Sequence, residues 1–398
     1  MKDPIKEVVL KDGTVHYRFV IDVGKHPNGN RRQLTVTKED ETEARIEYGR
    51  LAAAKANGTL ILPNKITVDQ WMDMWLASRE DEIEVTSLNT YTTNLKRVKS
   101  HLGHVPIQEL TDEQVEDFVK WMVGIDNARH PKRKKPLAIT TATATLGIFK
   151  DAMARAVTKR LVGVNVAAEI TIPRMARKAA RRAKPEVRPW NVGEVQRFVA
   201  AILNERLYAV HLLSLMGLRP AEVCGLRWVD IDFEAATLSI QNTRTMINNL
   251  RVVEKDTKSE AGDRDLPMPG PLVDALRKLK ACQAAEKLAA GRDYVDSGYV
   301  AVDELGQVLS TRNLREKVYR LMSLLALRRV RLYDARSSCL TYLANNGVPR
   351  HILARWAGHS NPRTTEQYYI KPDVEDLRGA ADTWAGLHGP AKAAREIL

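Results

Sequence analysis

The second half of the chain holds four short patterns of arginine, glutamate, lysine, histidine and tyrosine whose spacing could support chemistry. In order along the chain, the patterns are Gly217-Leu218-Arg219-Pro220-Ala221-Glu222, Thr257-Lys258-Ser259, Tyr333-Asp334-Ala335-Arg336, and Gly358-His359 followed by Tyr368. The first pattern predicts a helix that ends at Gly217 and another that begins at Pro220. Arg219 then lies where backbone N–H groups point outward, a position that suits a phosphate group. Glu222 could pin the Arg219 guanidinium, but complementing the helix dipole is the default expectation.

The other three patterns need neighbouring elements to bring them to the first. We expect a β-hairpin or small sheet from residues 236–242, 252–255 and 265–268, with Lys258 on the turn between the last two segments. A lysine on such a turn is usually solvated. Arg336 precedes an apolar helix over residues 339–345 that stops at Asn346-Gly347. The whole stretch from residue 190 to 398 is expected to form one α+β domain.

The composition restricts what such a protein can bind. The 398 residues include 62 Lys plus Arg and 49 Asp plus Glu, which gives a net charge of +13 and favours a polyanionic partner, either nucleic acid or an anionic membrane. No run approaches 18 apolar residues and the N-terminus lacks a secretion signal, so we expect no membrane association. Cys224, Cys282 and Cys339 have no Cys-x-x-Cys spacing, which predicts a reduced, intracellular protein with no zinc site.

Residues 1–60 are expected to form a three-stranded sheet and a helix. Alternation places Tyr17, Phe19 and Ile21 on one face, and a third strand follows at residues 31–36 before a helix over about 38–56. The opposite face carries Arg18, with Arg31 and Arg32 on the third strand. This face could enter a DNA major groove or could simply be solvated, and the residues favour the two interpretations equally.

Residues 66–170 have the pattern of a compact helical domain. Trp71, Met72 and Trp75 form an apolar stripe that we expect to be core, and Thr111 with Gln114 predicts a capping box. A second helix carries Lys96, Arg97 and Lys99, which are candidate DNA contacts.

Residues 171–189 are strongly basic. We predict a linker that stays extended and lies along a polyanion, although a solvated or nuclear-localisation-like run is the common alternative. The four candidate DNA contacts in it are Arg177, Lys178, Arg181 and Arg182.

Taken together and in this order, the four patterns resemble those of the tyrosine recombinase (phage integrase) family. The Gly-Leu-Arg-x-x-Glu element resembles the family's first arginine box, and Tyr333-x-x-Arg336 resembles its His-x-x-Arg box. Gly358-His359, with Tyr368 nine residues after the histidine, resembles its Gly-His box and nucleophilic tyrosine. The upstream regions resemble the arm-type DNA-binding domain (1–60) and the SAM-like core-binding domain (66–170) of three-domain phage integrases. The implied fold is multidomain and mainly α-helical with small β-sheets.

The resemblance implies a role for each matching residue. Tyr368 would be the nucleophile, Arg219 and Arg336 the phosphate contacts, Lys258 the general acid and His359 a further phosphate or proton-network contact. Tyr333 departs from the family's usual histidine. A phenol with a pKa of about 10 can donate to a phosphate oxygen but cannot readily take up a proton at neutral pH, so we expect phosphate contact only. Tyr369 is the alternative nucleophile, about 100° away on a helix, and the spacing favours Tyr368.

The predicted function is therefore a site-specific DNA recombinase that integrates and excises a phage or mobile element through a 3′-phosphotyrosine intermediate. The alternatives are a DNA-binding regulator with a degenerate recombinase domain, a type IB topoisomerase-like relaxing enzyme, and a metal-dependent nuclease or transposase. The resemblance implies double-stranded DNA with core-type and arm-type sites as the substrate, a homotetramer on that DNA, and work in a bacterial cytoplasm at the nucleoid. A host DNA-bending protein and a directionality factor are further expected partners, and neither cofactor nor metal is expected. A tail helix carrying Leu377, Ala380, Ala381 and Trp384 could dock on its own domain or on a neighbouring protomer.

Overall fold

The computed structural model describes residues 3–9, 13–25, 29–124, 136–183, 188–247, 251–256, 262–361, 363 and 377–385. The chain divides into two compact units, Met1–Pro185 and Glu186–Leu398. Each unit is described below by itself.

The first unit begins with the predicted sheet and helix. Antiparallel strands β1 (Lys6–Val9), β2 (Val15–Lys25) and β3 (Arg31–Lys38) are ordered β1-β2-β3, and α1 (Glu41–Ala56) follows. The alternation in β2 turns Phe19 and Ile21 inward, where they are buried with Ala44 and Leu51 of α1. Helix α1 begins at Asp40, whose side chain accepts a hydrogen bond from the Glu43 backbone N–H. The predicted three-stranded sheet and helix are confirmed.

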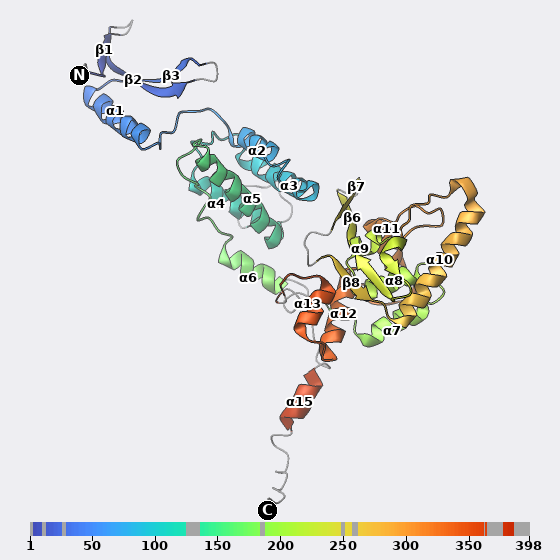
Figure 1. Ribbon diagram of the computed structural model, residues 1–398. Helices are drawn as coiled ribbons and strands as arrows, with labels where there is room; N and C mark the ends of the chain where they lie inside the picture. Colours follow the sequence, from blue (N-terminus) through green and yellow to red (C-terminus); the bar gives the residue numbers. More distant parts are fainter. Residues whose placement is uncertain are drawn as a thin grey trace, which may run out of the picture. The chain divides into compact units, whose positions relative to one another are not determined.

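Four helices then pack together, and Figure 1 shows them as a group. They are α2 (Val68–Ala77), α3 (Val85–Leu102), α4 (Asp112–Val123) and α5 (Ile139–Thr158). Helix α3 contacts each of the other three. The Trp71, Met72 and Trp75 stripe is buried, as predicted, and the Trp71 indole donates to the Ala152 carbonyl at 3.0 Å. The capping box at Thr111 is also confirmed.

The expectation of an extended basic linker is wrong in part. Residues 174–183 form the helix α6 (Arg174–Ala183), which has no buried residue. Alanines at four of its ten positions favour helix, and its arginines have good helix propensity, so local propensity explains the difference.

The second unit combines helices with two small sheets (Figure 1). Its helices are α7 (Val192–Ala201), α8 (Tyr208–Leu215), α9 (Pro220–Gly225), α10 (Gly270–Ala290), α11 (Thr311–Leu324), α12 (Asp334–Asn345), α13 (Arg350–Ala357) and α15 (Arg378–Ala385), with short 3-10 turns η1 (Trp228–Asp230) and η2 (Gly291–Asp293). Its strands are β4 (Ile231–Asp232), β5 (Thr237–Ile240), β6 (Asn242–Ile247), β7 (Arg251–Asp256) and β8 (Arg264–Pro267). Helix α8 is packed between α9, α10 and α12 in the core of this unit, and α13 contacts both α12 and β8.

The strands pair differently from the simplest expectation. Strand β7 forms a hairpin with β6, whereas β8 pairs with β5 in a separate sheet of order β4-β5-β8. The segment between β7 and β8, which contains Lys258, therefore connects two sheets rather than closing a hairpin.

Candidate active site

Arg219 is positioned by the tight connection between α8 and α9. Gly217 has φ +98°, a left-handed conformation that favours glycine, and a Cβ there would meet Cys339 Sγ at 3.4 Å. Arg219 then caps α9, with its side chain 29% exposed. Its Nη1 donates to Glu222 Oε1 at 2.6 Å, and its backbone N–H donates to Glu222 Oε2 at 2.8 Å. Glu222 therefore pins the guanidinium, and the default expectation of a dipole role alone was wrong.

Arg336 lies in the first turn of α12 and is only 1% exposed. Its Nη1 donates to the Gly217 carbonyl at 2.7 Å, and its Nη2 donates to the Ala357 carbonyl and lies 3.0 Å from His359 Nε2. Burial, reinforced by the positive charge of Arg219, lowers the pKa of Arg336 to about 10. The group still carries its charge at neutral pH, so it remains a cationic donor.

His359 follows the end of α13. Gly358 caps this helix with φ +62°, and the His359 backbone N–H donates to the Ala354 carbonyl at 2.9 Å. Burial, together with the charges of Arg336 and Arg219, lowers the pKa of His359 to about 4. The imidazole is therefore neutral at pH 7. Because a guanidinium can only donate, Nε2 accepts from Arg336 and the ring proton resides on Nδ1.

Tyr333 caps the start of α12, three residues before Arg336, and is 37% exposed. The neighbouring Arg331 and Asp334 form an ion pair at 2.7 Å that holds this corner of the chain. The phenol thus stands at the same helix end as Arg336 while remaining open to solvent.

One residue of this cluster is missed by reasoning from the sequence. Arg264 begins β8, and its side chain is 3% exposed. It donates in bidentate fashion to Glu222, from Nη1 to Oε1 at 3.2 Å and from Nη2 to Oε2 at 3.1 Å. Its Nε also donates to the Trp356 carbonyl at 2.9 Å.

A signal for Arg264 is present in the sequence. Arg264 alternates with Leu266 and Met268, both buried, so it lies on the inward side of the strand. An arginine on that side requires a buried anion, and Glu222 is that anion. Burial would raise the pKa of Glu222, but Arg264 and then Arg219 outweigh it and hold the pKa of this carboxyl below its ordinary value.

The cluster therefore gathers side chains from elements far apart in the sequence. Three consecutive carbonyls at the C-terminal end of α13 each accept from a different arginine: Trp356 from Arg264, Ala357 from Arg336, and Gly358 from Arg219 Nη2 at 3.2 Å. Carbonyls at this end of a helix carry partial negative charge, so cations are favoured there. Lys258 and Tyr368 lie outside the described residues.

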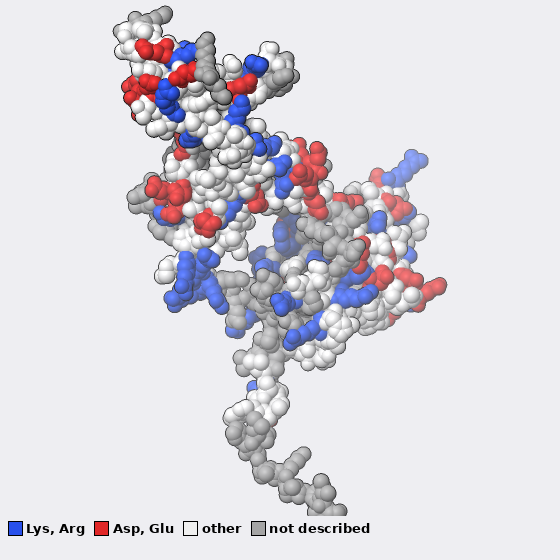
Figure 2. All heavy atoms as spheres, turned by 60° about the vertical axis from the view of Figure 1, so that its left-hand side comes forward, with Lys and Arg blue, Asp and Glu red and all other residues white. Residues whose placement is uncertain are grey.

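The predicted DNA contacts of the first unit differ in how far their charges are engaged. Lys99 lies 3.1 Å from Asp69 and 2.7 Å from Asp73, and Arg18 donates to Thr37 Oγ1 at 3.1 Å. Arg97 donates to the Thr93 carbonyl at 2.9 Å. The remaining candidates are mainly on the surface: Arg31, Arg32, Lys96, Arg177, Lys178, Arg181 and Arg182. Figure 2 shows Lys and Arg gathered over α6.

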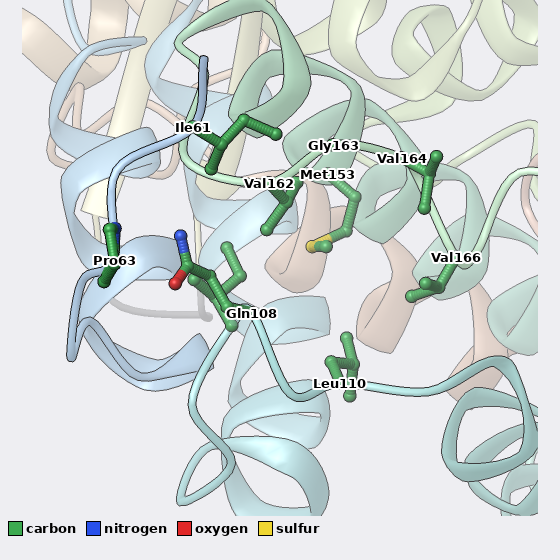
Figure 3. Close-up of a pocket in the computed structure, with 10 residues that line it drawn as sticks. Ile61, Pro63, Gln108, Leu110, Met153, Val162, Gly163, Val164 and Val166 are labelled. Carbon is green, nitrogen blue, oxygen red and sulfur yellow. The ribbon is translucent and has the colours of Figure 1, made fainter. Parts of the chain in front are cut away.

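The first unit also contains a pocket of about 260 Å³ (Figure 3). Its lining is mostly apolar, and the amide of its one polar side chain, Gln108, donates to the carbonyls of Leu62 and Leu161. None of the active-site arginines belongs to this unit.

Among the described residues, no group of three or more His, Cys, Asp or Glu side chains could hold a metal ion, and no described helix is long and apolar enough to cross a membrane.

Comparisons with known proteins agree along most of the chain. The model of the "Phage integrase SAM-like domain" matches residues 68–172, and that of the "Phage integrase family" matches residues 192–375. A "Tyrosine recombinase XerC-like" protein of Caldanaerobacter subterraneus is 24% identical, covering 94% of this chain and 97% of its own.

Two solved structures have the same fold. The Tn1549 transposon integrase in complex with transposon right-end DNA has a TM-score of 0.63 at 17% identity, over 80% of this chain and 99% of that one. The lambda integrase tetramer bound to a Holliday junction has a TM-score of 0.51 at 16% identity, over 95% of each chain. With both family models matched in the family's order, the chain belongs to the phage integrase family of tyrosine recombinases and is a site-specific DNA recombinase.

Proposed function

We propose that this recombinase uses Tyr368 to cut and rejoin DNA during integration and excision of a phage or other mobile element. The observation that supports the proposal most is the convergence of Arg219, Arg336 and His359 on the end of α13. Tyr368 follows this helix in sequence, so the chain leaves α13 beside the two guanidiniums before it reaches the tyrosine.

The reaction conserves the energy of the phosphodiester bond. The Tyr368 hydroxyl gives its proton to solvent as its oxygen forms a bond to phosphorus. The bond from phosphorus to the 5′ oxygen breaks at the same time, and Lys258 supplies the proton that this leaving oxygen needs. A 5′ hydroxyl of a second strand then attacks the phosphotyrosine and releases the tyrosine. No ATP is consumed.

The described side chains act on the charge of the transition state. Two guanidiniums stay charged at every relevant pH and offer planar donors to the nonbridging oxygens. Neutral His359, with its proton on Nδ1, offers a third donor, and the exposed Tyr333 hydroxyl offers a fourth. Tyr333 has no acid-base role in this scheme.

The partners follow from the same proposal. The helical module with α6 binds core-type sites, residues 1–60 bind arm-type sites, and four copies act together on two duplexes in the cytoplasm of a bacterial host, at its nucleoid. A DNA-bending protein of that host and a directionality factor would assist. The tetramer of lambda integrase on a Holliday junction supports the assembly.

A nicked suicide substrate tests the proposal. We expect a covalent protein–DNA adduct that survives in Tyr369→Phe, is lost in Tyr368→Phe and forms equally in EDTA. Tight DNA binding without any adduct would favour a regulator with a degenerate catalytic domain, and cleavage abolished by EDTA would favour a metal-dependent nuclease. Relaxation of supercoiled DNA without exchange between two sites would favour a topoisomerase.

A further inference from the structure

Arg264 is tied to every described member of the candidate active site except Tyr333. It contacts Glu222, which pins Arg219. Through the Trp356 carbonyl it also contacts the end of α13, which accepts a hydrogen bond from Arg336 and precedes His359. It also donates to the Gly262 carbonyl at 3.0 Å, which fixes the first described residue after the segment that carries Lys258.

The guanidinium is not placed to touch a substrate. Its charge is already paired with Glu222 in a bidentate contact, and each of its three nitrogens, Nε, Nη1 and Nη2, already donates a hydrogen bond. Its effect on a phosphate must therefore pass through other residues.

Fold stability alone is a weak explanation for this ion pair. Removing two charges from water carries a large desolvation penalty, so a buried pair is often no more stabilising than apolar side chains of the same volume. What the pair adds is geometry: a bidentate arginine–carboxylate contact fixes both planes, and the remaining carboxylate contacts fix Arg219.

We propose that Arg264 is a positioning residue for strand cleavage: it holds Glu222 and the C-terminal end of α13 in the register at which Arg219 meets the phosphate. The inference rests on the proposed roles of Arg219 and Tyr368. It adds a third arginine, one that binds no DNA, to the residues on which the reaction depends.

Single-turnover cleavage of a suicide substrate at saturating DNA measures this role in the full-length protein. We expect R264M to cleave about 10²-fold more slowly, comparable to losing one preorganised donor, while the Kd for DNA stays within about threefold. R264K keeps a charge beside Glu222 and should recover part of the rate. R264M cleaving within about threefold of wild type would overturn the proposal. If R264M does not fold, the test passes to R264K, which must still cleave more slowly than wild type.

Arg206 provides the matched control. It also contacts a glutamate in bidentate fashion, Glu286 at 2.5 and 2.7 Å, and donates to the carbonyls of Val302 and Asp303, and none of these partners lies in α13. R206M and R264M should both lower the melting temperature, because each leaves a buried or partly buried glutamate without its partner, but R206M should leave the cleavage rate of the folded protein unchanged. Equal slowing by R206M would reduce Arg264 to a purely structural role.

A double variant tests the route through Arg219. If Arg264 acts on Arg219, R219A/R264M should cleave no more than about threefold more slowly than R219A alone, because the second change removes nothing further. If the double variant instead loses the product of the two single-variant rate factors, Arg264 does not act through Arg219.

A measurement without chemistry separates this proposal from the function itself. In protein labelled with ¹⁵N-arginine and ¹³C-histidine, R264M should shift the Arg219 and His359 side-chain resonances, and R206M should not. Unchanged resonances overturn the positioning role even in protein that cleaves DNA, whereas shifted resonances support it even if Tyr368 forms no adduct.

Discussion

At the scale of the residue, the described active site is a set of cations held at close range by backbone carbonyls and one carboxylate. Burial lowers the pKa of Arg336 to about 10, a value at which a guanidinium is still charged near neutrality. A lysine in this place, with an ordinary pKa about two units lower than that of arginine, would lose its proton far more readily. The chemistry of the site therefore requires arginine at this buried position.

Replacing either of the arginines proposed to contact phosphate, Arg219 or Arg336, should separate cleavage from binding. We expect Arg219→Ala to slow cleavage by about 10² to 10³, or about 3 kcal/mol, with little change in Kd, because it removes one preorganised donor. Arg336→Ala should also lower the melting temperature, since the buried side chain donates to the Gly217 and Ala357 carbonyls. Cleavage rates, anisotropy titrations and thermal unfolding measure the three quantities, with the exposed Arg277→Ala as control. Equal losses of binding and cleavage would contradict the assignment.

At the scale of the element, α6 and α8 show how a helix can expose its titratable side chains or bury one of them. Helix α6 has no buried residue and bears Arg174, Arg177, Lys178, Arg181 and Arg182. Helix α8 instead encloses His211, which is 2% exposed and packs edge-on against Phe198.

Neutralising α6 should flatten the salt dependence of DNA binding. Each B-DNA phosphate that the protein ceases to neutralise lowers the slope of log K against log salt by about 0.9, so replacing Arg177, Lys178, Arg181 and Arg182 by Gln should reduce it by up to about 4. Titrations between about 50 and 200 mM salt, the range over which this effect is large, measure the slope. The matched control replaces the exposed Arg277, Lys278 and Lys280 of α10. A slope that the α6 variant leaves unchanged would mean that this helix does not lie on DNA.

His211 should make the protein acid-sensitive. Burial, with a contribution from Lys317, lowers its pKa to about 4, below the ordinary 6.5. The unfolded chain then binds the proton first, so stability is complete above about pH 6.5 and is lost as the pH falls toward 4, by about 3 kcal/mol in all. Urea unfolding of wild type and His211→Leu should diverge over this range, whereas the exposed His351→Gln should follow wild type. Parallel pH profiles for wild type and His211→Leu would contradict the assignment.

At the scale of the whole molecule, the described residues form separate apolar clusters in the sheet-and-helix segment, the four-helix segment and the second unit. The division into domains at residues 1–60, 66–170 and 190–398, with a linker over 171–189, stays a prediction.

Deleting residues 1–60 tests the division of labour. We expect the shortened protein to cleave core-type sites at the wild-type rate and to integrate poorly, because arm-type binding would disappear with the first sheet. Suicide-substrate cleavage and an integration assay between two attachment sites measure the two activities, and thermal unfolding confirms that the remainder folds. Full integration by the shortened protein would remove the arm-site role.

The sequence by itself determined most of the elements, with α6 the exception, and the order of the catalytic patterns. Period-two alternation at Phe19 and Ile21, the capping box at Thr111 and the Gly217–Pro220 boundary are local signals, because turn, cap and strand preferences act within a few residues. The resemblance to recombinases also needed only spacing, as with His359 and Tyr368.

Only the tertiary structure decided how these parts meet. It paired β7 with β6 rather than β8, turned Glu222 into the partner of two arginines, and placed Arg264 in the core. Most of these partners, and the carbonyls that hold Arg219 and Arg336, lie far from one another along the chain, and local preference carries no information about such contacts. They form because a buried charge must find its counter-charge wherever the fold brings one within reach.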